Sequence, residues 1–190
     1  MLPYLVKLSL SFTVAALVAG RGFRRALRRR PRRIQNGPWQ ASVSSGRRRA
    51  GIYSRAFAAR HEPLGLQRSE ALYFVAYTDS DGNKLRRGCT YSLSGQDPDT
   101  RWWSVAAYNN NTLIPNPRHR YSYSMTTVLR GADGRWTIRF SPREAGGNWL
   151  PSATEEGELK LVLRCYGPGA ELLANPAAAR LPQIVAGTSR

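Results

Sequence analysis

The sequence predicts an all-β protein: an antiparallel β-sandwich of jelly-roll type with one short helix, preceded by one N-terminal transmembrane helix. Three observations support this. Runs rich in aromatic and β-branched residues recur at roughly ten-residue spacing after residue 69. Clusters of Gly, Asp and Asn separate these runs, as turns require. An apolar stretch occupies residues 2–20. Because strands and helices do not alternate, a doubly wound parallel sheet is not expected.

The charge of the chain is strongly positive and unevenly spread. Among 190 residues, 29 are Lys or Arg and 12 are Asp or Glu, which gives a net charge of +17. More than half of this excess lies in residues 1–33, which contain Lys7, eight arginines and no acid. Basic residues gathered beside an apolar stretch favour a membrane anchor over a nucleic-acid-binding body. We therefore expect no nucleic-acid partner.

Residues 2–20 (LPYLVKLSLSFTVAALVAG) are long enough to cross a bilayer as a helix. Two interpretations compete: a retained signal anchor, and a signal peptide cleaved after the small residues Val18-Ala19-Gly20. We favour the anchor, because signal peptides carry their basic residues before the apolar core and here only the terminal amino group precedes it. The expected organisation is an anchor over 1–20, an Arg-rich juxtamembrane linker over 21–35, a sandwich domain over 36–185 and a tail over 186–190.

The run RGFRRALRRRPRR follows the apolar stretch directly. As a helix it would carry arginines around most of its circumference, so it is not expected to pack on the sandwich. We expect it to contact anionic lipid headgroups or an acidic partner, with Arg24, Arg25, Arg28 and Arg29 as the contacting residues. The alternative is a solvated linker that only stops transfer.

The elements of the body follow from turn signals and apolar alternation. Asn36-Gly37-Pro38 marks a turn beside a short strand within 34–44, and an Ala-rich segment predicts a helix over 50–61 that ends near Pro63. A hairpin is expected to join strands 70–78 and 85–94 across the turn at 79–83. Further strands are expected over residues 101–108, 121–129, 136–140 and 158–166.

The sequence contains no nucleophile elbow, P-loop or dinucleotide fingerprint. Two cysteines and two histidines are too few for a zinc finger or metal cluster, so no cofactor and no metal are expected. Cys89 and Cys165 each fall on the apolar face of a predicted strand. Two hypotheses stay open for them: buried thiols, or a disulfide in an oxidising compartment.

One group of polar and aromatic residues near predicted strand ends is a candidate binding groove for a carbohydrate, a lipid headgroup or a partner protein. A structural role is the favoured alternative, because tryptophans fill the ends of sandwiches while Arg and Asn cap loops. The candidate residues are Trp102, Trp103, Tyr108, Asn116, Arg120, Tyr121, Asn148 and Trp149.

The segments NGPWQASVS, SGQDPDTRWWSVAAYN, LIPNPRHRYSYS, DGRWTIRFSP, GNWLP and LVLRCYGP occur in this order between residues 36 and 185. In these segments the chain resembles the bacterial domain-of-unknown-function family 1214, in its short, single-domain, membrane-anchored form. The resemblance implies a jelly-roll-like sandwich outside the cytoplasmic membrane, with no established activity and no catalytic residue to carry over.

Location and function are expectations built on these observations. Arginines beside a membrane span tend to stay cytoplasmic, but we give more weight to the resemblance and expect a single-pass protein of the bacterial inner membrane with a periplasmic body. A cytoplasmic body is the alternative. The expected function is a noncatalytic accessory or binding module that contacts an envelope protein or a larger membrane complex. The alternative is a cell-envelope hydrolase acting on carbohydrate or ester in the aromatic groove.

Overall fold

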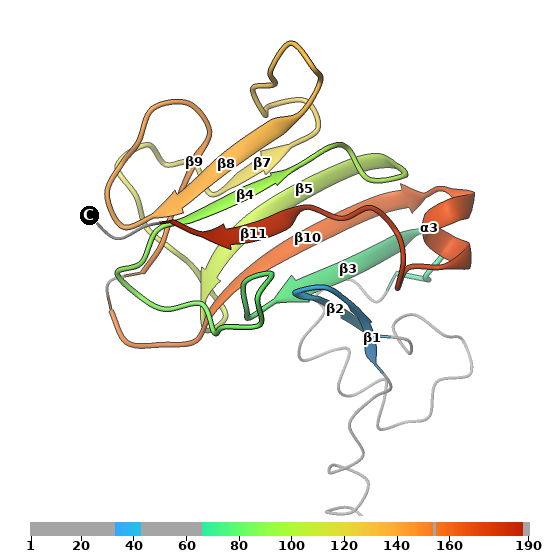
Figure 1. Ribbon diagram of the computed structural model, residues 1–190, viewed down its shortest axis with the longest axis horizontal. Coiled ribbons are helices and arrows are strands. Elements are labelled where there is room, and N and C mark those ends of the chain that lie inside the picture. Colours follow the sequence, from blue (N-terminus) through green and yellow to red (C-terminus); the bar gives the residue numbers. More distant parts are fainter. Residues whose placement is uncertain (1–32, 43–65, 154, 188–190) are drawn as a thin grey trace, which may run out of the picture.

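The computed structural model describes residues 33–42, 66–153 and 155–187 and contains two β-sheets (Figure 1). The seven-stranded sheet has the order β1-β2-β3-β10-β5-β6, with β7 also paired to β5, and the four-stranded sheet has the order β11-β4-β8-β9. Every strand pair is antiparallel except β8 with β9. The strands are β1 (Arg33–Asn36), β2 (Trp39–Ser42), β3 (Ala71–Ala76), β4 (Tyr91–Gly95), β5 (Thr100–Asn109), β6 (Thr112–Leu113), β7 (Ser122–Ser124), β8 (Trp136–Ser141), β9 (Trp149–Pro151), β10 (Leu159–Pro168) and β11 (Gln183–Ala186).

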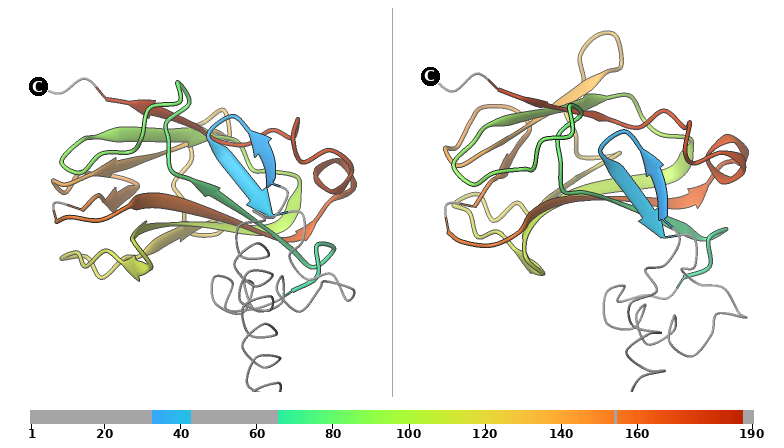
Figure 2. Two further views of the ribbon diagram at one scale, coloured as in Figure 1. Left: turned by 90° about the horizontal axis from the view of Figure 1, so that it is seen from below. Right: turned by 60° about the horizontal axis from the view of Figure 1, so that its bottom comes forward.

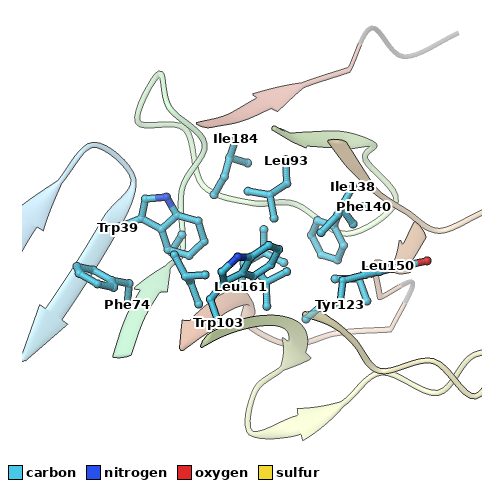
Figure 3. Close-up of a cluster of buried hydrophobic side chains, with 14 of the residues drawn as sticks. Trp39, Phe74, Leu93, Trp103, Tyr123, Ile138, Phe140, Leu150, Leu161 and Ile184 are labelled. Carbon is cyan, nitrogen blue, oxygen red and sulfur yellow. The ribbon is translucent and has the colours of Figure 1, made fainter. Parts of the chain in front are cut away.

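The two sheets form a sandwich-like pair of layers, and Figure 2 shows them in two further orientations. Side chains alternate between the two faces of a strand, so one face of each sheet supplies the shared core. Phe74, Trp103 and Leu161 enter this core from the seven-stranded sheet, whereas Leu93 and Ile138 enter it from the four-stranded sheet (Figure 3). Full burial of each such side chain contributes about 1.5–3 kcal/mol.

Strand β10 is the central element of the larger sheet. It pairs with β3 on one side and with β5 on the other, and Leu163 lies opposite both Phe74 and Val105. All three side chains are fully buried. The alternation of the predicted strand 158–166 is confirmed, as are the predicted strands that became β3, β5 and β8.

The predicted hairpin between residues 70–78 and 85–94 is wrong. Strand β3 pairs with β2 and β10, whereas β4 pairs with β8 and β11 in the other sheet. The turn itself forms: the Asp79 carboxylate accepts hydrogen bonds from the amides of Asp81 and Asn83, and a single bridge joins Thr78 to Lys84. The chain then crosses from one sheet to the other instead of folding back on β3.

The predicted strand 121–129 is also shorter than expected. Only Ser122–Ser124 is a strand, and the amides of Thr127 and Val128 bond to the Ser124 carbonyl in a turn. The Ser124 amide donates to the Thr127 hydroxyl, and the Ser124 hydroxyl bonds to those of Thr126 and Thr127. Such local bonds compete with a strand for the backbone groups, and here they end it.

The helix of the described residues, α3 (Ala170–Ala174), was not predicted. The Asp99 carboxylate accepts hydrogen bonds from the amides of Glu171 and Leu172. A residue distant in sequence thus supplies the hydrogen-bond acceptor that the amides of the first helical turn lack within the helix. The predicted helix over 50–61 lies outside the described residues. So do the predicted anchor over 1–20 and the arginines at positions 21–32, whereas Arg33 is the first residue of β1. Within the described ranges, no helix is long and apolar enough to span a membrane.

Candidate functional site

The eight residues of the predicted groove do not meet in one place. Trp102 and Trp103 are consecutive on β5, so their side chains leave opposite faces of the strand. Trp103 is fully buried and its ring lies 4.7 Å from that of Trp136, on the opposing sheet. Trp102 is 36% exposed on the outer face. One of the pair therefore belongs to the core and the other to the surface.

Asn148 and Trp149 hold the fold together. The Asn148 side chain accepts from the Leu129 amide at 2.8 Å and donates to the carbonyls of Leu129 and Thr137 at 2.7 and 3.0 Å. The buried Trp149 donates its amide to the Tyr123 hydroxyl and its indole N–H to Ser141. These polar groups are already used within the protein, so neither residue is free to bind a ligand with them.

Asn116, Arg120 and Tyr121 belong to the loop before β7. Asn116 donates to the carbonyls of Ile114 and Arg120 and accepts from the Arg120 amide, which closes the loop on itself. The Arg120 guanidinium lies 5.0 Å from the ring centre of Tyr123. Tyr121 is partly exposed. The favoured structural interpretation therefore fits Asn116, Asn148, Trp103 and Trp149.

A different set of side chains gathers on the outer face of the seven-stranded sheet. We call Tyr73, Trp102, Tyr108, Arg164 and Tyr166 the aromatic face. Tyr166 lies opposite Trp102 in the β10–β5 register, with ring centres 5.5 Å apart, and its ring also meets Tyr73 edge-on at 6.1 Å. Arg164 donates to the Tyr108 hydroxyl at 2.5 Å, with its guanidinium 5.6 Å from that ring's centre. Adjacent strands thus assemble one continuous patch.

The charge of this surface is positive. The outward positions of β3, β5 and β10 carry Lys160 and Arg164 and no carboxylate. Lys160 donates to the Asn111 side chain, and partial burial lowers its pKa although Glu158 acts in the opposite direction. Two of the predicted groove residues, Trp102 and Tyr108, belong to the aromatic face. Sequence reasoning missed Tyr73, Arg164 and Tyr166, although each lies opposite the apolar face of a predicted strand.

Both cysteines are free thiols in this structure, which agrees with the first of the two hypotheses, and no disulfide joins Cys89 to Cys165. Cys165 is buried on the core face of β10, and burial raises its pKa to about 12. Cys89 is partly exposed in the connection that precedes β4. In the part of the chain that the structure describes, no three His, Cys, Asp or Glu side chains gather as metal ligands would.

One solved structure supports this fold. The crystal structure of the VPA0106 protein from Vibrio parahaemolyticus matches with a TM-score of 0.59 and 27% identity, over 74% of this chain and 36% of that one. A putative uncharacterized protein from Burkholderia cenocepacia matches with a TM-score of 0.41 and 15% identity, over 64% and 30%. The chain thus spans about a third of the length of these two solved proteins.

No curated protein matches the chain. The sequence pattern of one family, described as "Protein of unknown function (DUF1214)", matches residues 70–170. These residues include the strands from β3 through β10 and so contain most of both sheets. The match covers more than half of the chain, which therefore belongs to the DUF1214 family.

Proposed function

We propose that this protein is a noncatalytic binding module whose aromatic face docks on an acidic surface of an envelope protein or a larger membrane complex. In this proposal the sandwich has jelly-roll topology and is held at the bacterial inner membrane by a transmembrane helix over residues 1–20, with the body in the periplasm. The arginines after that helix contact anionic lipid headgroups.

The observation that carries the proposal is the composition of the aromatic face. Trp, Tyr and Arg are the residue types enriched at the energetic centres of protein interfaces, and here they form one patch across β3, β5 and β10. The ring contacts and the Arg164–Tyr108 hydrogen bond hold the side chains in place before any partner arrives. Binding then costs little side-chain entropy.

The positive charge of the aromatic face indicates the charge of the partner's surface. Lys160 and Arg164 are the charged residues at the outward positions of the three central strands, and Glu158, the carboxylate that acts on Lys160, lies just before β10. A partner surface that carries Asp or Glu would neutralise them, whereas a basic surface would be repelled. We therefore expect the partner's contact surface to be acidic.

The interaction is tested by isolating the full-length protein from the membranes of its host in mild detergent and quantifying the proteins bound to it. The double variant Trp102→Ala with Arg164→Gln removes the exposed ring and one positive charge of the aromatic face. The matched control, Val185→Ala with Arg143→Gln, removes one exposed apolar side chain and one positive charge from elsewhere on the surface.

We expect the aromatic-face variant to retain at least tenfold less of a stoichiometric partner than the wild-type protein does. The amount retained by the control should fall less than twofold. Circular dichroism of both variants checks that the fold is kept. Equal retention in the two variants, or equal loss from both, contradicts the proposed docking surface. Because binding of a charged partner is weakened by salt, the captured amount should also fall as ionic strength rises.

The membrane part of the proposal rests on the sequence alone and has its own test. Protease added to intact spheroplasts should digest the sandwich and leave the membrane-embedded segment, because we place the body outside the inner membrane. A body that becomes sensitive only after the spheroplasts are lysed is cytoplasmic, which contradicts the proposed orientation and leaves the docking test unaffected.

A further inference from the structure

The outer side of the four-stranded sheet contains a hollow of about 520 Å³ beside β8. Arg135, just before β8, and Thr137 and Arg139 within it alternate with the buried Trp136 and Ile138, so all three point outward and line the hollow. Turns on either side of the strand complete the walls. We call this the arginine hollow, and its lining residues are Leu129, Gly131, Asp133, Arg135, Thr137, Arg139, Gly146, Gly147 and Asn148.

The hollow has an excess of positive charge that the protein does not neutralise. Neither the Arg135 nor the Arg139 guanidinium has an ion pair or hydrogen bond with any described residue. The one carboxylate of the lining, Asp133, accepts a hydrogen bond from the Arg135 amide and holds the turn. The lining therefore contains two unpaired guanidinium groups and one carboxylate.

Carboxylates just outside the hollow are already paired. Glu144 forms an ion pair with Arg118 at 2.5 Å, and Asp97 forms one with Arg130 at 2.9 Å. Arg118 also donates to the carbonyls of Ala145 and Gly147, which holds one wall of the hollow in position. The nearby acids thus have cationic partners of their own, and the charge of Arg135 and Arg139 is available to a ligand.

The shape of the hollow is set before any ligand binds. Asn148 forms the floor, and its three hydrogen bonds join the Leu129 turn to β8. A Cβ atom added to Gly146 or Gly147 would meet no atom within 4 Å, so no other part of the protein fills the space beside these two glycines. Leu129 is 66% exposed at the rim and offers an apolar surface beside the charged groups.

We propose that the arginine hollow binds a sugar that carries an oxyanion, either a phosphate or a carboxylate. Arg135 and Arg139 contact the oxyanion, because guanidinium groups bind both anions through paired hydrogen bonds. The Thr137 hydroxyl bonds to a sugar hydroxyl, and Leu129 contacts the apolar face of the ring. The volume falls within the range of about 300–1,000 Å³ typical of small-molecule sites and exceeds what a bare ion needs.

This site is independent of the aromatic face, since the two belong to different sheets. The test is calorimetric titration of the full-length protein in neutral detergent at low ionic strength. Four probes separate the contributions: glucose 6-phosphate, glucuronate, neutral glucose and inorganic phosphate. The variants are Arg135→Gln and Arg139→Gln. Arg143→Gln is the matched control, because it removes the same charge from an exposed position outside the lining.

We expect saturable binding of at least one anionic sugar. Tighter binding of glucose 6-phosphate would identify the oxyanion as a phosphate, and tighter binding of glucuronate would identify it as a carboxylate. Glucose and inorganic phosphate should each bind at least fivefold more weakly than that sugar. Arg135→Gln and Arg139→Gln should each weaken binding at least fivefold, and Arg143→Gln less than twofold. Absence of saturable binding by both anionic sugars overturns the proposal. So does an equal loss in the control, which would indicate bulk charge, or equal affinity for inorganic phosphate, which would indicate an ion site only.

Discussion

The two sheets share one core and present opposite kinds of outer surface. The outer face of the seven-stranded sheet carries the half-buried rings of Tyr73 and Tyr166 and the exposed ring of Trp102, and Tyr166 contacts the other two. The outer face of the four-stranded sheet carries Thr137 and Arg139 of β8 and Arg135 just before it, all exposed and bordering a hollow. The first surface suits a broad protein contact, whereas the second suits a small polar ligand.

The difference shows that alternation along a strand makes two environments from neighbouring residues. Trp102 and Trp103 are identical side chains joined by one peptide bond, yet one is fully buried and the other belongs to the aromatic face. The same holds for Trp136, which is buried, and its neighbours Arg135 and Thr137, which are exposed. Function in this sandwich is therefore expected from the outward positions and stability from the inward ones.

The largest expected effect is the loss of stability when the buried member of the two consecutive tryptophans is replaced. Trp103→Ala should lower the free energy of unfolding by about 3–5 kcal/mol, because it removes a fully buried ring stacked on Trp136 and leaves a cavity. Trp102→Ala should cost under about 1 kcal/mol, since its ring is already partly in water. Urea unfolding followed by circular dichroism measures both values. Equal losses would contradict the division between core and aromatic face.

A smaller effect is expected from the two asparagines of the predicted groove. Asn148→Ala should cost about 2–3 kcal/mol, because it leaves the backbone groups of Leu129 and Thr137 without their partner beneath the arginine hollow. Asn116→Ala acts on a loop at the surface, where water replaces the lost bonds, and should cost less than about 1 kcal/mol.

The same unfolding experiment serves both asparagine variants, with the wild-type protein as reference. Binding of the anionic sugar adds a second readout, since Asn148→Ala should loosen the hollow and weaken that binding while Asn116→Ala should not. A larger stability loss in Asn116→Ala than in Asn148→Ala would contradict the structural role assigned to the floor of the hollow.

The smallest effect concerns the two thiols. At pH 8 Cys89 should react with iodoacetamide in the folded protein, whereas Cys165 should react only after unfolding, since it is buried and its pKa is raised to about 12. Mass spectrometry of the labelled peptides measures this. Labelling of both cysteines at equal rates in the folded state, or of neither because they form a disulfide, contradicts the structure.

The raised pKa of Cys165 also predicts the direction of a pH effect. Between the ordinary thiol pKa of 9.0 and about 12, the unfolded chain loses this proton while the folded protein keeps it. Stability from this group is therefore complete below pH 9 and falls as pH rises towards 12. Cys165→Ala should reduce the loss of stability over this pH window, as measured by urea unfolding at several pH values.

Much of the fold could be predicted from the sequence, because apolar alternation shows directly which face of a strand is buried. Strands β3, β5, β8 and β10 were found in this way. Alternation does not show which strands pair, so the crossing of the chain from β3 to β4 in the other sheet was missed. The three-residue β9 and the five-residue α3 are too short to produce a period at all.

The candidate site was harder to predict than the fold, for a related reason. Trp102, Trp103 and Trp149 look alike as polar-aromatic signals, but the register places them on an outer surface, in the core and beneath Arg118. The partners of Trp102 on the aromatic face come from β10, more than sixty residues later in the chain. Only the pairing of β5 with β10 brings these residues together.

The central claim is that a partner docks on the aromatic face and not on the opposite sheet. A photoreactive benzoylphenylalanine placed at Trp102 keeps an aromatic ring at that position, and the same residue at Gln183 probes an exposed position of β11. Irradiation of host cells that carry either full-length variant should give one defined protein adduct from position 102 and none from position 183. Adducts of equal yield from both positions, or no adduct from position 102, would contradict the account.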